Sequence, residues 1–533
     1  MAQIQFKGKS FVQNHHLLVK YHELIPIKNK SLTDKVSLHD NLIIYGDNLK
    51  ALKALLPIYA GKIKCIYIDP PYNTGNEKWV YNDNVNSPMM QQWLGKAVDQ
   101  EDLTRHDKWL CMMMPRLKLL KELLRDDGVI FASIDDNEIH RLRLVMDEVF
   151  GEEHRVGTFT WRRRMNPDSR NINGVSEDHE YVLCYVRSEI RFTGSEKNLE
   201  KYTNPDDDPR GPWMSMDMTG LANKQQRPNL HYSIVDPSTG KSYDPPPQRG
   251  WAYSKDRVIT MIEKGEVIFP ATDRGRPRQK KYLKDLKTET MGFSTWLDLG
   301  FTNTDGTRML QRIFQKKVFD FPKPVELIQS LISQVTSHSD IILDSFAGSG
   351  TTAHATLAIN KEDGGKRKFI LVECENYANE LTAERVRRVI NGVPEAKDEN
   401  LKKGLGGTFS YFELGEPIEL ENILSGDRLP SYSELARYIF YTATGEEFDA
   451  KALNEKNNFV GESRNYKVYL FYEPNIEKLK NIALTLDRAK SIGKPGEKRR
   501  LVFAPTKYLD QAHLDELRID FAQLPFEIYE LAR

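Results

Sequence analysis

Short apolar runs alternate with stretches of helical spacing in the first part of this 533-residue chain. Residues 42–45, 65–68 and 128–134 are apolar and rich in β-branched or aromatic side chains, which predicts strands. Residues 49–56 and 109–124 carry apolar side chains at helical spacing. Repeated strand–helix units predict a mostly parallel sheet with helices on both faces.

The alternation stops near residue 156 and resumes near residue 316, where strands are predicted at 341–343 and 368–372. The segment between is rich in Pro, Trp, Tyr and turn-forming residues, which predicts a mostly β insertion. We therefore expect a doubly wound, Rossmann-like α/β sheet interrupted by a β insertion and followed by an α+β module. The expected divisions are an arm at 1–40, sheet halves at 41–155 and 316–412, the insertion at 156–315 and a C-terminal module at 413–533.

Composition excludes several classes of protein. The 76 basic and 76 acidic residues cancel, and no apolar run is long enough to span a bilayer, so we expect no membrane association. The first residues lack an apolar secretory segment, and the four cysteines are scattered without paired spacing. We expect a cytoplasmic protein with neither a metal site nor a disulfide.

The run Asp69-Pro70-Pro71-Tyr72 follows a predicted strand directly. An exocyclic amine on a base is a poor nucleophile, and a catalyst must hold its hydrogens so that electron density stays on nitrogen. The Asp69 carboxylate and the Pro70 carbonyl are suitable acceptors, and the Tyr72 ring offers a surface for a base flipped out of a duplex. The other interpretation is a structural turn, since Asp and Pro are good turn formers.

The run Asp344-Ser345-Phe346-Ala347-Gly348-Ser349-Gly350-Thr351-Thr352 also follows a predicted strand, and small residues there allow a ligand to approach the backbone. A loop for nucleoside triphosphates needs a Lys before its Ser or Thr, and this run has none. S-adenosylmethionine has no phosphates to neutralise and fits better. Glu373 ends the next strand, where an acid can bind ribose hydroxyls.

Two basic clusters lie in the predicted insertion. One contains Arg162, Arg163 and Arg164 after Trp161, and the other runs from 274 to 287. The second cluster includes Arg274, Arg276, Arg278, Lys280 and Lys281. Grouped cationic side chains suit DNA phosphates, although a solvated surface is the alternative explanation for either cluster.

These motifs and their order resemble the β group of S-adenosylmethionine-dependent DNA amino-methyltransferases, in which the base-binding motif precedes the cofactor motif. The closer resemblance is to the modification subunit of type III restriction-modification systems. The matching stretches are Tyr45 to Leu52, Ile68 to Gly75, Gly128 to Glu138, Phe321 to Leu327 and Asp344 to Thr352. The resemblance covers about residues 40–412 and implies a circularly permuted methyltransferase sheet.

The resemblance also implies a role for each matching residue. Asp69, Pro70, Pro71 and Tyr72 would form the catalytic motif that holds the flipped base. The cofactor contacts would be Asp344, Phe346, Gly348, Gly350, Thr351, Glu373 and, near its carboxylate, Lys323. Asp47 and Asp135 lie at strand ends as further cofactor contacts, with helix caps or turns as the other interpretation.

An aspartate at position 69 favours adenine N6, because cytosine N4 enzymes of this class more often carry serine there. The resemblance implies a target-recognition role for the insertion, double-stranded DNA as substrate, a homodimer and a partner restriction subunit with helicase and nuclease activity. Two alternatives stay open: a stand-alone DNA amino-methyltransferase for adenine N6 or cytosine N4, and a non-catalytic DNA-reading scaffold. The recognised DNA sequence does not follow from these motifs.

Overall fold

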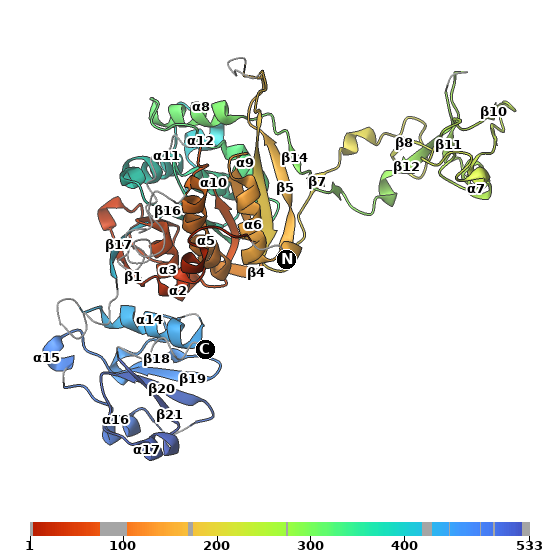
Figure 1. Ribbon diagram of the computed structural model, residues 1–533. Coiled ribbons are helices and arrows are strands. Elements are labelled where there is room, and N and C mark those ends of the chain that lie inside the picture. Colours follow the sequence, from red (N-terminus) through yellow and green to blue (C-terminus); the bar gives the residue numbers. More distant parts are fainter. Residues whose placement is uncertain are drawn as a thin grey trace. The chain divides into compact units, whose positions relative to one another are not determined.

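The computed structural model describes residues 4–74, 104–168, 174–272, 275–417, 429–446, 448–479, 481–493 and 496–524. The chain forms two compact units (Figure 1). One comprises Met1–Phe192 and Ser294–Arg533, and the other comprises Thr193–Phe293.

A ten-stranded sheet forms the centre of the larger unit, in the order β1-β17-β2-β16-β15-β3-β4-β6-β5-β14. All neighbours from β17 to β4 are parallel, whereas β1, β6 and β5 add antiparallel pairs. The strands are β1 (His22–Pro26), β2 (Leu42–Tyr45), β3 (Ile63–Ile68), β4 (Leu124–Ile134), β5 (Arg155–Arg162), β6 (His179–Val186), β14 (Trp296–Leu297), β15 (Ile341–Asp344), β16 (Lys368–Glu373) and β17 (Ser410–Pro417). The predicted, mostly parallel sheet is confirmed.

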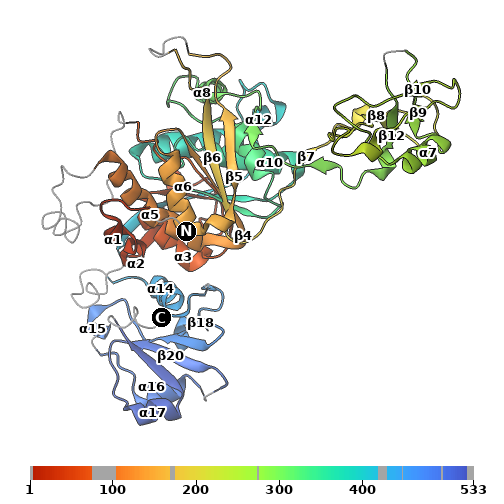
Figure 2. The same cartoon turned by 45° about the vertical axis from the view of Figure 1, so that its right-hand side comes forward.

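Helices cover both faces of this sheet (Figure 2). Alternate residues of β2 face opposite cores: Leu42 and Ile44 pack in one, and Ile43 packs in the other. The first core contains α3 (Asn48–Tyr59), α5 (Arg105–Leu123) and α6 (Ile139–Phe150), whereas α8 (Asn303–Phe314), α10 (Thr351–Asp363) and α11 (Glu384–Asn391) contribute to the second. The remaining helices of this part are α1 (Lys9–Val12), α2 (His15–Leu18), α9 (Val325–Ile332), which packs on α10, and α12 (Glu399–Lys403).

The sheet joins segments that are far apart in sequence. Strand β3, which precedes the Asp69 motif, lies beside β15, which ends in the Asp344 motif, with Ile66 opposite Leu343. From this pair the chain continues to β4 on one side and to β16 on the other. Such a switch point opens a crevice at the carboxyl ends of parallel strands, where ligands of α/β proteins bind.

The described residues of the smaller unit form short strands, one α-helix and short 3-10 helices. Strands β11, β12 and β8 form its three-stranded sheet. Its elements are β7 (Ser195–Glu196), β8 (Trp213–Asp217), β9 (Ile234–Val235), β10 (Ser242–Tyr243), α7 (Lys255–Glu263), β11 (Val267–Ile268), β12 (Arg278–Tyr282) and β13 (Thr290–Met291). This unit is narrower than the insertion predicted at 156–315, because β5 and β6 form antiparallel pairs that extend the main sheet from β4. Among the described residues no helix lies between β5 and β6, so the strand–helix alternation is interrupted although both strands belong to the main sheet.

A second sheet lies near the C-terminal end of the described chain, in the order β18-β19-β20-β21. Its last three strands are parallel and alternate with helices, so this module contains strand–helix–strand units. Its elements are α14 (Tyr432–Thr444), β18 (Phe459–Glu462), β19 (Tyr466–Leu470), α15 (Ile476–Leu479), α16 (Leu486–Ser491), β20 (Arg499–Ala504), α17 (Gln511–Glu516) and β21 (Ile519–Gln523). No helix among the described residues is long and apolar enough to cross a membrane.

Candidate active site

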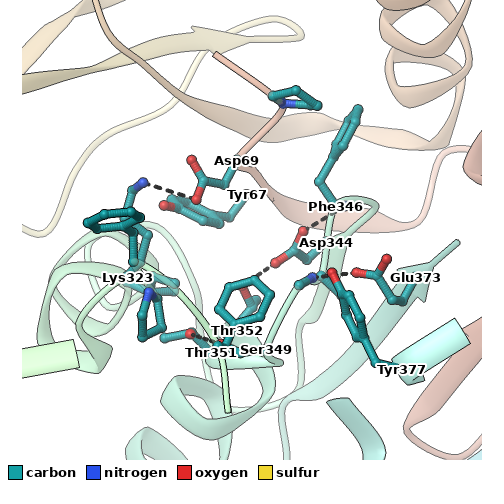
Figure 3. A pocket seen from close by; sticks show the side chains of 17 residues that line it. Tyr67, Asp69, Lys323, Asp344, Phe346, Ser349, Thr351, Thr352, Glu373 and Tyr377 are labelled. Atoms are coloured by element: carbon teal, nitrogen blue, oxygen red, sulfur yellow. Dashed lines mark hydrogen bonds and ion pairs between the residues drawn. The ribbon is translucent and has the colours of Figure 1, made fainter. Parts of the chain in front are cut away.

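A cavity of about 190 Å³ lies where the carboxyl ends of β3, β15 and β16 meet (Figure 3). Both motifs contribute to it, since Asp69 and Pro71 lie on one side and the loop after Asp344 lies on the other. Glu373 and Lys323 complete its charged lining. The sequence-predicted residues that line it are Asp69, Pro71, Lys323, Asp344, Phe346, Gly348, Thr351 and Glu373.

The two carboxylate oxygens of Asp69 have different surroundings. Oδ2 lies 3.0 Å from the ammonium of Lys323, an ion pair that is visible in Figure 3. Oδ1 is buried and accepts no hydrogen bond from the described residues. Burial raises the pKa of Asp69, while the Lys323 ammonium acts in the opposite direction. The ion pair therefore holds Oδ2 in place, whereas Oδ1 is left without a hydrogen-bond donor.

Lys323 lies on the base side of the cavity. The sequence predicted that it approaches the carboxylate of a cofactor, but its ammonium is engaged by two protein carboxylates, Asp69 and Glu180. It also lies 4.9 Å from the centre of the Tyr72 ring, within cation–π range. This ammonium thus orients the residues that the first motif supplies.

Glu180 is the functional candidate that the sequence analysis missed. It lies on β6 with 4% of its side chain exposed, and it accepts hydrogen bonds from the Tyr72 hydroxyl at 3.1 Å and from Arg163 at 3.0 Å. Burial raises its pKa, but Lys323 and Arg163 outweigh that effect and lower it. The available signal was a carboxylate inside the apolar run of residues 179–186, where an unpaired charge is costly.

The two prolines fix the backbone around the motif. The Pro71 carbonyl accepts a hydrogen bond of 2.7 Å from the Trp109 indole, which lies on α5. Pro70 is buried and is not part of the cavity lining. Asn73, the next residue after Tyr72, has a left-handed backbone conformation with a φ of +57°.

Two carboxylates hold the second loop. Asp344 accepts from the Phe346 amide at 3.0 Å and from the Thr352 hydroxyl at 2.5 Å. Glu373 accepts from the Gly348 amide at 2.6 Å and from the Glu375 amide at 3.0 Å. Burial raises the pKa of each carboxyl to about 7.

Gly348 and Gly350 adopt left-handed backbone conformations, with φ of +51° and +78°. A side chain at Gly350 would place its Cβ 3.2 Å from the Thr382 carbonyl oxygen. Beneath the loop, the buried guanidinium of Arg385 donates to the Ser349 hydroxyl at 2.9 Å and to the Thr351 hydroxyl at 2.8 Å. The loop is therefore a close-fitting backbone surface, as its small residues predict.

Gly350, in the second loop, does not line the cavity, and two further predicted cofactor contacts lie elsewhere. Asp47 caps α3 by accepting from the Lys50 amide at 3.1 Å, and Asp135 accepts from the Asn137 amide at 3.0 Å. Neither residue lines the cavity. Both carboxylates occupy the cap or turn positions that were the other interpretation of their place at strand ends.

The predicted DNA-binding side chains divide between the two units. In the larger unit, Arg162 contacts Asp298 at 3.3 Å and Arg164 contacts Asp168 at 2.7 Å, while Arg163 binds Glu180. In the smaller unit, Arg278 donates to Ser215, Lys280 pairs with Asp206 and Asp208, and Arg276 and Lys281 are exposed. Arg274 lies outside the described residues. No group of His, Cys, Asp and Glu with metal-ligand geometry occurs within the described ranges.

Comparison with known proteins gives a consistent result. A family model described as a DNA methylase, for N6 and N4 enzymes, matches residues 63–384. The chain is 30% identical to the Type III restriction-modification enzyme StyLTI Mod subunit of Salmonella typhimurium, over 86% of this chain and 74% of that protein. It is 30% identical to the EcoPI Mod subunit of Escherichia phage P1, over 72% and 67%. It is 34% identical to the type II methyltransferase M.KpnI of Klebsiella pneumoniae, over 65% and 83%.

Proposed function

Because this chain belongs to the DNA methylase family of N6 and N4 enzymes, we propose that it methylates adenine N6 in DNA, with S-adenosylmethionine as methyl donor. The observation that carries the proposal is the buried Oδ1 of Asp69, an acceptor without a donor at the rim of the cavity. A base amine supplies the missing N–H group. Cytosine N4 is the alternative target, and the aspartate at position 69 favours adenine by resemblance to the family.

Asp69 accepts a hydrogen of the base amine, and Lys323 holds the Asp69 carboxylate in position. Lys323 binds Oδ2, which leaves Oδ1 to accept one amine hydrogen and to keep electron density on the nitrogen. Tyr72 presents its ring beside them, while its hydroxyl is held by Glu180. Positive and negative side chains alternate along the series Arg163, Glu180, Lys323 and Asp69. Each charge is therefore compensated by its neighbour.

The charge of the cavity fits the proposed donor. Three carboxylates, from Asp69, Asp344 and Glu373, face a single ammonium from Lys323. This excess of carboxyl groups disfavours a ligand with phosphates, and a bound cation would in turn favour their ionised form. S-adenosylmethionine when bound supplies a methyl group on a positively charged sulfur. The loop from Phe346 to Thr351 would hold its methionine part, and Glu373 its ribose hydroxyls.

We also propose that this chain is the modification subunit of a type III restriction-modification system, since two of the relatives carry that name. In this role it would act as a homodimer with a restriction subunit, and residues 193–293 would read the DNA sequence. Exposed Arg276 and Lys281 support a DNA contact by that unit. A stand-alone methyltransferase is the second candidate, favoured by the likeness to M.KpnI.

The test is a methylome of a host that expresses the chain or its Asp69→Ala variant. The wild type should methylate adenine N6 at one sequence, and the variant should lose at least about a thousandfold in methyl transfer because the amine loses its acceptor. Asp126→Ala, at a carboxylate with a 92% exposed side chain, is the matched control and should retain activity. Near-normal transfer by Asp69→Ala would refute the mechanism.

Restriction of unmodified phage, measured when this chain is co-expressed with a candidate restriction subunit that has helicase and nuclease activity, distinguishes the two candidates. Restriction that needs both chains supports the type III role. Methylation without any restriction phenotype supports the stand-alone enzyme.

A further inference from the structure

A second cavity, of about 780 Å³, lies beside the first one in the larger unit. Its lining contains Arg163, Arg164 and Arg308 and one carboxylate, Asp305. Each guanidinium has a carboxylate partner: Glu180 for Arg163, Asp168 for Arg164 and Asp305 for Arg308. The Arg164 and Arg308 side chains are 38% and 64% exposed, so these surface ion pairs are weak and a phosphate can replace the carboxylate. The Phe321 side chain lines both cavities and is the residue that they share. Neither the established family activity nor the predicted DNA-binding set assigns a role to Phe321 or to Arg308.

Phe321 has a conformation that folding alone does not favour. Its ring is 78% exposed, and its backbone φ is +53°, which is costly for any residue with a side chain. The following residue is Pro322, which further restricts the backbone before it. Glycine would relieve this strain. An exposed aromatic ring in a strained backbone at the junction of two cavities points to a ligand contact.

Asn303 also lines the second cavity, and one of its side-chain atoms lacks a hydrogen-bond partner among the described residues. Its side-chain nitrogen donates to Glu180 at 3.4 Å, which orients the amide. Its Oδ1 is buried and accepts no hydrogen bond from the described residues. The second cavity therefore combines cations that suit an anion with an acceptor that suits an N–H group.

Tyr72, the ring that the base-binding motif supplies, does not line the first cavity, whereas Phe321 does. The Tyr72 hydroxyl is held by Glu180, and the Lys323 ammonium lies 4.9 Å from the Tyr72 ring centre. A base that leaves the duplex loses stacking on both of its faces, and enzymes that flip bases replace it with aromatic or apolar side chains. Because Phe321 lines both cavities, its ring can supply such a surface.

We propose that the second cavity holds the nucleotide next to the flipped adenine on the same DNA strand, and that the Phe321 ring stacks between the two bases. The inference rests on the proposed function. Arg164 and Arg308 bind the phosphates of this nucleotide, and Asn303 accepts from its base. Consecutive nucleotides are covalently joined, so they need adjoining cavities with a shared wall, which Phe321 forms.

The decisive variant is Phe321→Gly. Relief of backbone strain should keep or raise its thermal stability, whereas loss of the ring should lower its affinity for DNA. Glycine tolerates a φ of +53°, so the thermal midpoint should stay equal or rise. Loss of the ring should lower the affinity for an unmethylated duplex that contains the enzyme's target sequence by about ten- to a hundredfold. Phe321→Tyr keeps the ring and should bind like wild type. Phe301→Ala is the matched control, because Phe301 is 40% exposed and lines neither cavity.

Two further measurements test the occupant itself. With 2-aminopurine at the target position, the fluorescence of the bound complex should rise in Phe321→Gly, since the flipped base has lost a quenching neighbour. Arg308→Gln and Arg164→Gln should each lower the slope of log affinity against log salt by about one. The affinity for S-adenosylmethionine should stay unchanged in all of these variants.

Phe321→Gly with the DNA affinity and fluorescence of Phe301→Ala would overturn the inference. A loss of cofactor affinity in Phe321→Gly would also overturn it, because the ring would then belong to the cofactor cavity. In either case wild-type methylation of DNA leaves the proposed function intact. If the wild type methylates no DNA, the proposed function itself fails.

Discussion

The two sides of the first cavity use their carboxylates differently. Asp69, on the base side, has one oxygen on Lys323 and one without a donor. Asp344 and Glu373, on the cofactor side, use both oxygens to hold amide or hydroxyl groups of the loops that follow β15 and β16. These two carboxylates fix the conformation of the loops in addition to the ribose contact proposed for Glu373, whereas Asp69 keeps one oxygen entirely available for a substrate. Substitutions on the two sides should therefore fail in different ways.

The largest expected effect is on the cofactor side, in Gly350→Asp. Its Cβ would meet the Thr382 carbonyl at 3.2 Å in a backbone with φ of +78°, which would displace the neighbouring loop residues that line the cavity. Cofactor affinity should fall by at least about a thousandfold, or about 4 kcal/mol. Equilibrium dialysis with labelled S-adenosylmethionine measures it, and DNA binding should persist.

Gly364→Asp is the matched control for this substitution. Gly364 has a similar φ of +71°, but a Cβ there meets nothing within 4 Å. The control should lose stability from backbone strain and keep its cofactor affinity. Equal losses of affinity in both variants would show that the loop shape is not the cause.

The next effect is a pH dependence of stability on the cofactor side. Burial raises the pKa of Asp344 and Glu373 to about 7, whereas both ionise near 4 in the unfolded chain. Between these values the unfolded state releases protons that the folded state retains, so the free energy of unfolding falls as pH rises from about 4 to 7. Each group contributes on the order of 3 kcal/mol to that fall.

Urea unfolding of the cofactor-free protein at pH 5 and pH 8 measures this difference. Asp344→Asn should lose less stability between these two values than the wild type does. Glu180 gives the opposite sign, because its pKa is lowered and its contribution is lost on acidification. An Asp344→Asn variant with the wild-type pH dependence would show that Asp344 is ionised in the folded state.

Much of this arrangement could be predicted from the sequence, because it depends on local patterns. Strand β3 and strand β15 are apolar runs followed by their motifs, and parallel strands bring such motifs to one edge of the sheet. The contact between Lys323 and Asp69 could not be predicted, since it joins residues far apart in sequence. Glu180 was missed because the strand that carries it was assigned to the insertion, and only the pairing of β6 with β4 places it here.

Lys323→Met tests the base side with a smaller effect. If Lys323 orients Asp69, the variant should lose about ten- to a hundredfold in the rate of methyl transfer, equivalent to about 1.4 to 2.7 kcal/mol, with little change in cofactor affinity. If Lys323 instead binds the carboxylate of the cofactor, cofactor affinity should fall by more than the rate does. Single-turnover transfer and dialysis separate these outcomes. Lys317→Met, at a 61% exposed lysine, is the control.

The smallest effect concerns Asp47, which the sequence placed on the cofactor side and the structure places at the start of α3. Asp47→Ala removes both the cap on the Lys50 amide and the ion pair with Arg116 at 3.5 Å. It should cost about 1 to 2 kcal/mol of stability and leave cofactor affinity unchanged. Asp47→Asn keeps a good cap and should be close to wild type in urea unfolding. If Asp47→Asn instead lowers cofactor affinity tenfold while stability is unchanged, Asp47 is a ligand of the cofactor, and the cofactor side extends beyond the cavity lining to β2.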